Sequence, residues 1–236
     1  MDQCRLCEKP GVLRDSHIVP EFLYKDLYNE KRHMMGINGK GKSGWKALQK
    51  GLREKLFCDD CEQLLNDRYE KPFVKYWRDN NPIPQTLKPG ELIEIQVPDY
   101  TSFKLFHLSI FFRAAISSLP TYRDANLNEK HVARLRELIL TGDPGKHWEY
   151  MVFGNVLTHH KSFKPVAMVS QPYPRRLDGN KALGMIYGKV DWYITTISHR
   201  AKAIEGVALT SEGAMPLLAT RWDTHEVLKA ANRYLN

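Results

Sequence analysis

Four cysteines in two matched pairs are the residues whose types and spacing point most directly to chemistry. They occur as Cys4-x-x-Cys7 and Cys58-x-x-Cys61, and the 236-residue chain contains no other cysteine. A C-x-x-C spacing lets a tight turn bring two sulfurs to one ion, and two such pairs complete a tetrahedral zinc site. Four thiolates leave no open position for a substrate, so we expect this zinc to be structural.

Two other uses of the cysteines compete with zinc. A thioredoxin-like redox site needs only one C-x-x-C pair, placed between a strand and a helix, and four independent buried thiols need no matched spacing at all. Because the two pairs have the same internal spacing and account for every cysteine, zinc is the interpretation we prefer. The ion would then join residue 4 to residue 61.

One histidine between the cysteine pairs lies in a short extended segment, Ser16-His-Ile-Val-Pro20. An imidazole has a reference pKa of about 6.5, so the side chain of His17 could accept a proton near neutral pH and act as a general base. Considered by itself, a histidine close to a zinc-binding turn is more often a hydrogen-bonded structural residue. The residues of this segment leave both roles open.

Residues 31–55 form a basic segment that carries eight Lys or Arg residues against Glu54 alone, a net charge of +7. Its five glycines let the backbone approach a phosphate, and Trp45 offers a ring for base stacking. The candidate phosphate-binding residues are Lys40, Lys42, Lys46, Lys50 and Arg53. The alternative is a solvated insertion whose lysines balance the negative charge of a four-thiolate zinc site.

The overall composition suits a globular protein with a polyanionic partner. Hydrophobic residues make up 42% and charged residues 26%, which argues against disordered and fibrous classes. The net charge of +8 makes nucleic acid the first partner class to consider. The longest apolar stretch, residues 105–116, is too short to cross a bilayer, and the N-terminus lacks a secretory signal pattern. We therefore expect a cytoplasmic protein without a membrane partner.

The pattern of hydrophobic and turn residues predicts an α+β fold with a domain boundary near residue 80. Residues 1–80 form the cysteine-containing part and end in a helix around 73–77, before a segment rich in Pro and Gly. For residues 81–236 the expected elements are a strand at 93–97, a buried helix at 102–118, a helix at 128–141, strands at 148–157, 165–169, 183–187 and 190–197, and a closing helix at 223–235. We expect the four strands between residues 148 and 197 to form a small antiparallel sheet under the closing helix.

The motifs taken together resemble the zinc-stapled HNH (ββα-metal) endonucleases. In particular they are similar to a bacterial group with a Ser-His-Ile-x-Pro segment, here residues 16–20, and a Leu-x-Cys-x-x-Cys-Glu segment, here residues 56–62. The segment 103–113 also resembles the buried helix of that group. The resemblance implies a zinc-bound ββα module (HNH-like or treble-clef-like) at residues 1–80, followed by an accessory domain of helices and antiparallel sheet at 81–236.

The resemblance also implies roles for individual residues. His17 would be the general base that activates water, and Mg²⁺ or Mn²⁺ would bind the scissile phosphate. This chain departs from the family pattern at three positions: Ser16 replaces an Asp or His ligand, Glu62 replaces a His or Asn, and Arg53 stands near the expected Asn. A carboxylate suits both cations, so Glu62 is the preferred second catalytic residue. Further candidate ligands are Asp15, Asn66 and Glu70.

These inferences lead to two hypotheses about function. The first is metal-dependent hydrolysis of nucleic-acid phosphodiester bonds, with DNA preferred over RNA and bacterial defence against foreign DNA as the implied role. The second is a non-catalytic zinc module that binds nucleic acid, or a partner protein through residues 81–236. A shared cleft for His17 and Glu62 favours the enzyme, whereas side chains that point apart favour the binding module.

Overall fold

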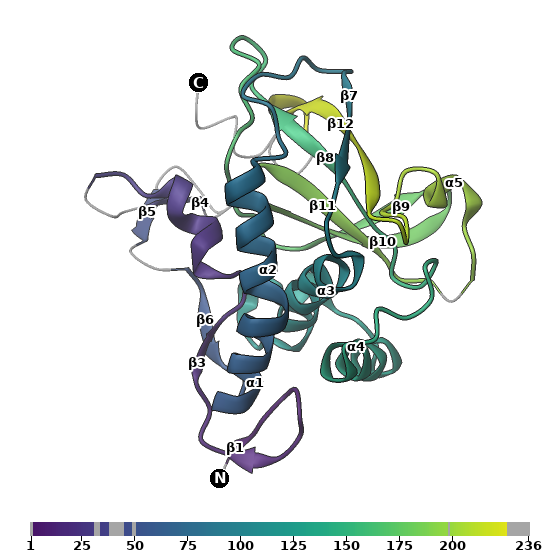
Figure 1. Cartoon of the computed structure of the whole chain (residues 1–236). Coiled ribbons are helices and arrows are strands. Elements are labelled where there is room, and N and C mark those ends of the chain that lie inside the picture. Colours follow the sequence, from purple (N-terminus) through teal and green to yellow (C-terminus); the bar gives the residue numbers. More distant parts are fainter. Residues whose placement is uncertain (1, 31–33, 38–44, 49–50, 198, 226–236) are drawn as a thin grey trace.

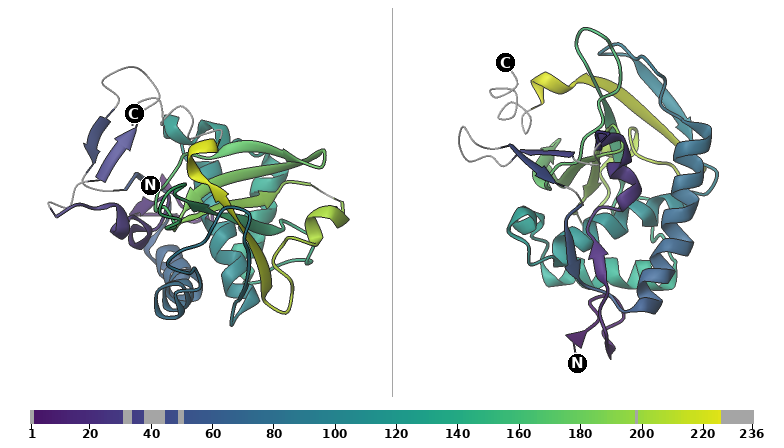
Figure 2. Two further views of the ribbon diagram at one scale, coloured as in Figure 1. Left: turned by 90° about the horizontal axis from the view of Figure 1, so that it is seen from above. Right: turned by 90° about the vertical axis from the view of Figure 1, so that its left-hand side faces the viewer.

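Short paired strands and one long helix build the cysteine-containing part of the chain (Figure 1). The computed structural model describes residues 2–30, 34–37, 45–48, 51–197 and 199–225, with the backbone alone for 34–37 and 45–48. Three antiparallel pairs are formed by β1 (Asp2–Gln3) with β2 (Pro10–Gly11), β3 (Asp15–His17) with β6 (Arg53–Lys55), and β4 (Met34–Ile37) with β5 (Trp45–Leu48). The β4–β5 pair stands at one side of the molecule (Figure 2).

The helix that follows β6 runs from residue 59 to residue 80. It consists of α1 (Asp59–Leu65), the π-helical turn η2 (Asn66–Glu70), α2 (Lys71–Val74) and the π-helical turn η3 (Lys75–Asn80). Pro72 lies at the start of α2 and has no amide hydrogen to donate to the preceding turn. The helix ends at Asn81, whose φ of 41° is left-handed. A helix around residues 73–77 is thus confirmed, and it is longer than that segment.

A six-stranded sheet lies in the second half of the chain. Its order is β7 (Leu92–Gln96), β12 (Ala214–Arg221), β8 (Val152–Thr158), β11 (Val190–Thr195), β10 (Asn180–Tyr187) and β9 (Tyr173–Leu177). Neighbouring strands are antiparallel except β12 and β8, which are parallel. The predicted antiparallel sheet is therefore confirmed in part: four of the five strand pairings are antiparallel, but the sheet has six strands, and β12 joins β8 through a non-local parallel pairing.

Two predicted elements differ from the structure in this region. The segment 165–169 forms a single bridge, from Pro165 to Thr158, and no strand, since proline cannot donate to a ladder. The predicted closing helix falls mostly on residues 226–236, which lie outside the described residues; its first part is the 3₁₀ turn η5 (Trp222–Thr224). The shorter helical elements are η1 (Glu21–Leu27), η4 (Pro120–Ala125) and α5 (Lys202–Glu205).

The two longer helices of the second half match their predictions. α3 (Tyr100–Ile116) begins where the Asp99 side chain accepts from the backbone N–H of Ser102, and fourteen of its seventeen residues are buried. α4 (Glu129–Thr141) is capped by the Asn128 side chain and ends at Gly142, whose φ is +75°. Within the described residues, no helix has the length and hydropathy needed to cross a membrane.

The hydrophobic core continues across residue 80. α3 packs against the helix at residues 59–80, where the rings of Phe73 and Phe106 stack with centroids 3.8 Å apart. The helix at residues 59–80 also contacts the sheet, since the ring of its Trp77 lies 5.7 Å from the ring of Trp192 in β11. A smaller hydrophobic cluster, which includes Phe153, covers the opposite face of the sheet. The boundary near residue 80 stays a prediction, but the segments on its two sides share one core.

Candidate functional site

The four cysteines come together at the start of α1. Their sulfur atoms all lie within 4.8 Å of one another, and the Sγ atoms of Cys7 and Cys58 are 3.8 Å apart. Zinc–sulfur bonds of about 2.3 Å in a tetrahedron place neighbouring sulfurs about 3.8 Å apart, so the spacing fits zinc. The backbone N–H of Cys58 also donates to the Sγ of Cys4 at 3.3 Å. As predicted, the cluster can hold a metal ion such as zinc.

Backbone hydrogen bonds tie the segment that carries His17 to the chain just before α1. The backbone N–H of Arg14 donates to the carbonyl of Phe57 at 2.7 Å, and that of Ile18 donates to the carbonyl of Leu52 at 3.1 Å. β3 pairs with β6 in the register that sets His17 opposite Arg53. The cysteine cluster therefore lies at one end of a strand pair whose other end carries the histidine.

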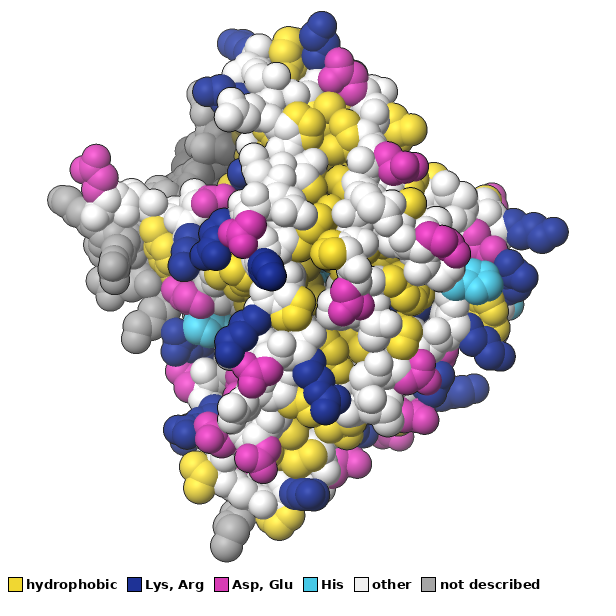
Figure 3. All heavy atoms as spheres, in the orientation of Figure 1, with side chains coloured by type: hydrophobic (Ala, Val, Ile, Leu, Met, Phe, Trp, Pro, Cys, Tyr) yellow, Lys and Arg dark blue, Asp and Glu magenta, His cyan; other side chains and the backbone are white. Residues whose placement is uncertain are grey.

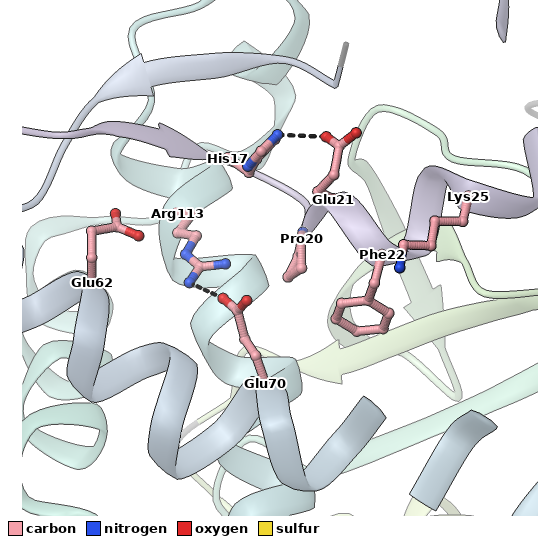
Figure 4. A pocket seen from close by; sticks show the side chains of 8 residues that line it. All are labelled: His17, Pro20, Glu21, Phe22, Lys25, Glu62, Glu70 and Arg113. Atoms are coloured by element: carbon pink, nitrogen blue, oxygen red, sulfur yellow. Dashed lines mark hydrogen bonds and ion pairs between the residues drawn. The ribbon is translucent and has the colours of Figure 1, made fainter. Parts of the chain in front are cut away.

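A pocket of about 350 Å³ lies between β3, η1, the helix at residues 59–80 and α3 (Figure 4). Its lining residues are His17, Pro20, Glu21, Phe22, Lys25, Glu62, Glu70 and Arg113. The two predicted catalytic residues, His17 and Glu62, thus share one pocket. Of the further candidate ligands, Glu70 lines this pocket; Asn66 lines a neighbouring hollow, and Asp15 lines neither.

The imidazole of His17 is held by an acidic partner. Its Nε2 lies 2.6 Å from Oε2 of Glu21, and the hydroxyl of Tyr28 donates to the other oxygen of that carboxylate at 2.7 Å. Burial lowers the pKa of His17 below its ordinary 6.5, and the Arg53 guanidinium lowers it further, while Glu21 acts in the opposite direction. The ring is therefore neutral at pH 7, the form that accepts a proton.

The two glutamates of the long helix have different partners. The hydroxyl of Ser16 donates to Oε1 of Glu62. Glu70 instead forms an ion pair with Arg113, whose Nη2 lies 2.5 Å from Oε1 of the glutamate. The side chain of Arg113 is only 2% exposed, and its Nε has no hydrogen-bond partner among the described residues. In Figure 4 the guanidinium lies between Glu62 and Glu70, so it supplies positive charge inside an acidic pocket.

Most of the predicted phosphate-binding lysines cannot be placed at the pocket. Lys40, Lys42 and Lys50 lie outside the described residues, and for Lys46 only the backbone, within β5, is described. Arg53 is described, and its guanidinium nitrogens lie 3.6 Å from Asp15 and 4.0 Å from Glu21. Arg53 is therefore already engaged with carboxylates beside His17. Whether this segment binds phosphate stays a prediction.

Sequence reasoning missed four pocket residues, Glu21, Phe22, Lys25 and Arg113, and two of them carried a signal. Glu21 comes four residues after His17, directly behind the proline that ends the extended segment, a spacing that lets two side chains meet across one turn. Arg113 is a charged residue inside a stretch that is otherwise apolar, which indicates a buried partner. Nothing in the sequence pattern singles out Lys25, because an exposed lysine after an apolar pair is common.

Among the described residues, the four cysteines are the only group of three or more His, Cys, Asp or Glu side chains close enough to share one ion. None of the family models, curated proteins or solved structures compared with this chain matches it. The functional argument therefore depends on the motifs and on the geometry of the His17 pocket.

Proposed function

We propose that the chain is an HNH-like, metal-dependent endonuclease that hydrolyses nucleic-acid phosphodiester bonds, DNA in preference to RNA. The observation that supports this most is the pocket in which the neutral imidazole of His17 faces a space lined by Glu62, Glu70 and Arg113. A base, carboxylates and a guanidinium around one phosphate-sized space are the groups that phosphodiester hydrolysis requires. Zinc bound by the four cysteines would stabilise the part of the fold that positions this site.

His17 acts as the base in this proposal. We assign the ring proton to Nε2, which lies 2.6 Å from Oε2 of Glu21, so that Nδ1 can take a proton from water. The water oxygen forms a bond to phosphorus while the bond to the leaving ribose oxygen breaks. The imidazolium that results carries a positive charge beside the carboxylate of Glu21, which stabilises it. Glu21 is thus a positioning residue that fixes the tautomer and the orientation of the ring.

Carboxylates on the long helix suit a hard divalent cation. Mg²⁺ commonly binds one or two carboxylates and completes its coordination with water and substrate phosphate, so Glu62 would be a sufficient protein ligand, and Glu70 would join it only if its ion pair with Arg113 opened. The bound Mg²⁺ or Mn²⁺ would supply charge stabilisation at the phosphate and the leaving oxygen. Ser16 orients the carboxylate of Glu62, which explains how a serine can stand at this position in place of a metal ligand. Arg113 adds a fixed positive charge for the phosphate.

Cleavage of circular single-stranded DNA and of supercoiled plasmid with Mg²⁺ or Mn²⁺ tests the proposal. His17→Ala should lower the rate by about 10²- to 10⁴-fold, the usual contribution of a general base, and should keep one zinc per chain. The matched control is His199→Ala, an exposed histidine far along the chain, which should cleave at the wild-type rate. Equal activity of wild type and His17→Ala would overturn the assignment of the base.

A second candidate function is nucleic-acid or protein binding without cleavage. It is favoured by the Glu70–Arg113 ion pair, which occupies one carboxylate that a cation would need. In that case purified wild type should bind DNA with a steep salt dependence and should leave both plasmid and single-stranded DNA intact with either cation. Any His17-dependent nicking would rule this candidate out. A role in bacterial defence remains part of the first proposal and depends on demonstrated cleavage.

A further inference from the structure

A second hollow adjoins the His17 pocket along the helix at residues 59–80. Its volume is about 410 Å³, and it is lined by Phe22, Asn66, Glu70, Lys71, Val74, Lys75, Arg78 and Asp79. Phe22 and Glu70 line both spaces, so the two form one groove that starts at His17 and follows the helix toward its C-terminal end. We call this combined space the helix groove.

Basic side chains border the helix groove along its length. Lys71 and Arg78 are paired with acidic neighbours, at 2.6 Å from Asp67 and 3.1 Å from Asp79. Lys75, which lies between them, is exposed and has no acidic partner among the described residues. The space-filling view shows Lys and Arg side chains gathered over and beside this helix, with acidic side chains interspersed (Figure 3).

At the His17 end, Lys25 has the same character as Lys75. Its side chain is exposed, has no acidic partner within the described part of the chain, and extends beside Phe22 at the rim of the pocket (Figure 4). Two ammonium groups without an acidic partner among the described residues therefore line the hollows that meet at Phe22. Such groups attract the phosphates of a polyanion, because each contact releases a condensed counterion.

Phe22 supplies an aromatic surface where the two hollows meet. Its ring is half-buried, and it is held from below by Phe73 and Phe106, both with ring centroids 6.0 Å away. A ring fixed in this way offers a base a stacking surface with little loss of side-chain freedom. Base stacking on aromatic rings, combined with flanking cations, is how proteins bind single strands without reading sequence.

We propose that the helix groove binds an unpaired nucleic-acid strand, with phosphates at Lys25 and Lys75 and one base on Phe22. This names the substrate class of the proposed nuclease and, for cleavage, rests on that function. A duplex keeps its bases stacked between two backbones, so it offers no free base face to a ring between hollows of 350 and 410 Å³. A single strand can place a base there and continue into the His17 pocket.

Fluorescence anisotropy on the full zinc-loaded chain, without Mg²⁺ or Mn²⁺, tests the groove separately from cleavage. The probe is labelled oligothymidylate of about thirty nucleotides, compared with the duplex it forms with oligodeoxyadenylate, a length at which that duplex stays paired at room temperature. At about 0.1 M salt, Lys25→Ala and Lys75→Ala should each weaken single-strand binding about fivefold, since one phosphate contact contributes a salt slope of about 0.7. Phe22→Leu, which keeps an apolar side chain over the core, should weaken it about fivefold or more.

The matched control is Lys130→Ala, an exposed lysine on α4, which should bind as wild type does. If the two groove lysines matter no more than Lys130, or if duplex binds as tightly as single strand, the groove proposal is wrong, even when the protein cleaves DNA in a His17-dependent way. If single strands bind through Lys25 and Lys75 but no cleavage occurs, the groove proposal stands and the nuclease proposal fails.

Discussion

Removing one partner of the Glu70–Arg113 ion pair should destabilise the fold far more than removing one partner of an exposed pair, and Glu70→Gln tests this. The substitution keeps the shape of the side chain but leaves the arginine charge uncompensated, and the Arg113 side chain is only 2% exposed. Breaking a buried pair on one side typically costs about 3–5 kcal/mol. Glu70 itself is 20% exposed and glutamine can still accept a hydrogen bond, so we expect a loss of about 3 kcal/mol.

A double variant separates the charge from the geometry. In Glu70→Gln combined with Arg113→Met, the uncompensated charge is gone and an apolar chain fills its space, so most of the lost stability should return. The matched control is Glu137→Gln, which removes an exposed partner of Arg134 on α4 and should cost less than about 1 kcal/mol.

Urea unfolding of the zinc-loaded protein at pH 7, with linear extrapolation, measures these differences. The reasoning is refuted if Glu70→Gln and Glu137→Gln lose equal stability, or if the double variant is less stable than Glu70→Gln alone. Either result would mean that the carboxylate of Glu70 is not needed to hold the guanidinium in the pocket, and that it is available to a cation.

Three further predictions follow from the site and the core. Cys61→Ser should lower the zinc content well below one equivalent by metal analysis, with loss of the cooperative unfolding transition; full zinc occupancy would count against the four-cysteine site. In the pH–rate profile of DNA cleavage, the acid limb should lie below pH 6.5. Arg53→Ala should move this limb to higher pH, because the positive charge of Arg53 lowers the pKa of His17. A limb that stays in place or moves to lower pH would contradict the assignment of His17 as the base. Burial lowers the pKa of Lys104 from 10.5 to about 8. Between pH 8 and 10.5 the unfolded chain therefore binds more protons than the folded chain, and the free energy of unfolding increases as the pH rises. Lys104→Met should therefore be more stable than wild type by up to about 3 kcal/mol near pH 7. Urea titrations should show that this difference in the free energy of unfolding becomes smaller toward pH 10. A difference that stays the same at every pH would contradict the prediction.

Local spacing allowed much of this structure to be predicted. The two C-x-x-C pairs indicated a shared ion, and their sulfurs do converge. The helical spacing of apolar residues within 128–141 predicted α4, and the dense apolar run of α3 indicated a buried helix. These signals depend on residues a few positions apart, where backbone preference and hydrophobic period act directly.

Contacts between distant segments account for what could not be predicted. β12 contains Pro216 and pairs in parallel with a strand about sixty residues earlier, and neither feature has a local signature. The pairing of Arg113 with Glu70 joins α3 to the long helix, and it depends on how the two pack. The placement of Glu21 on His17 similarly depends on the turn that follows Pro20.

Anomalous diffraction from crystals soaked with Mn²⁺ and a non-cleavable phosphorothioate oligonucleotide tests the central claim most directly. The proposal predicts manganese density at Glu62 beside a backbone phosphate, with the His17 imidazole facing that phosphate across the pocket. An ordered oligonucleotide elsewhere on the surface, with no manganese between Glu62 and His17, would contradict it.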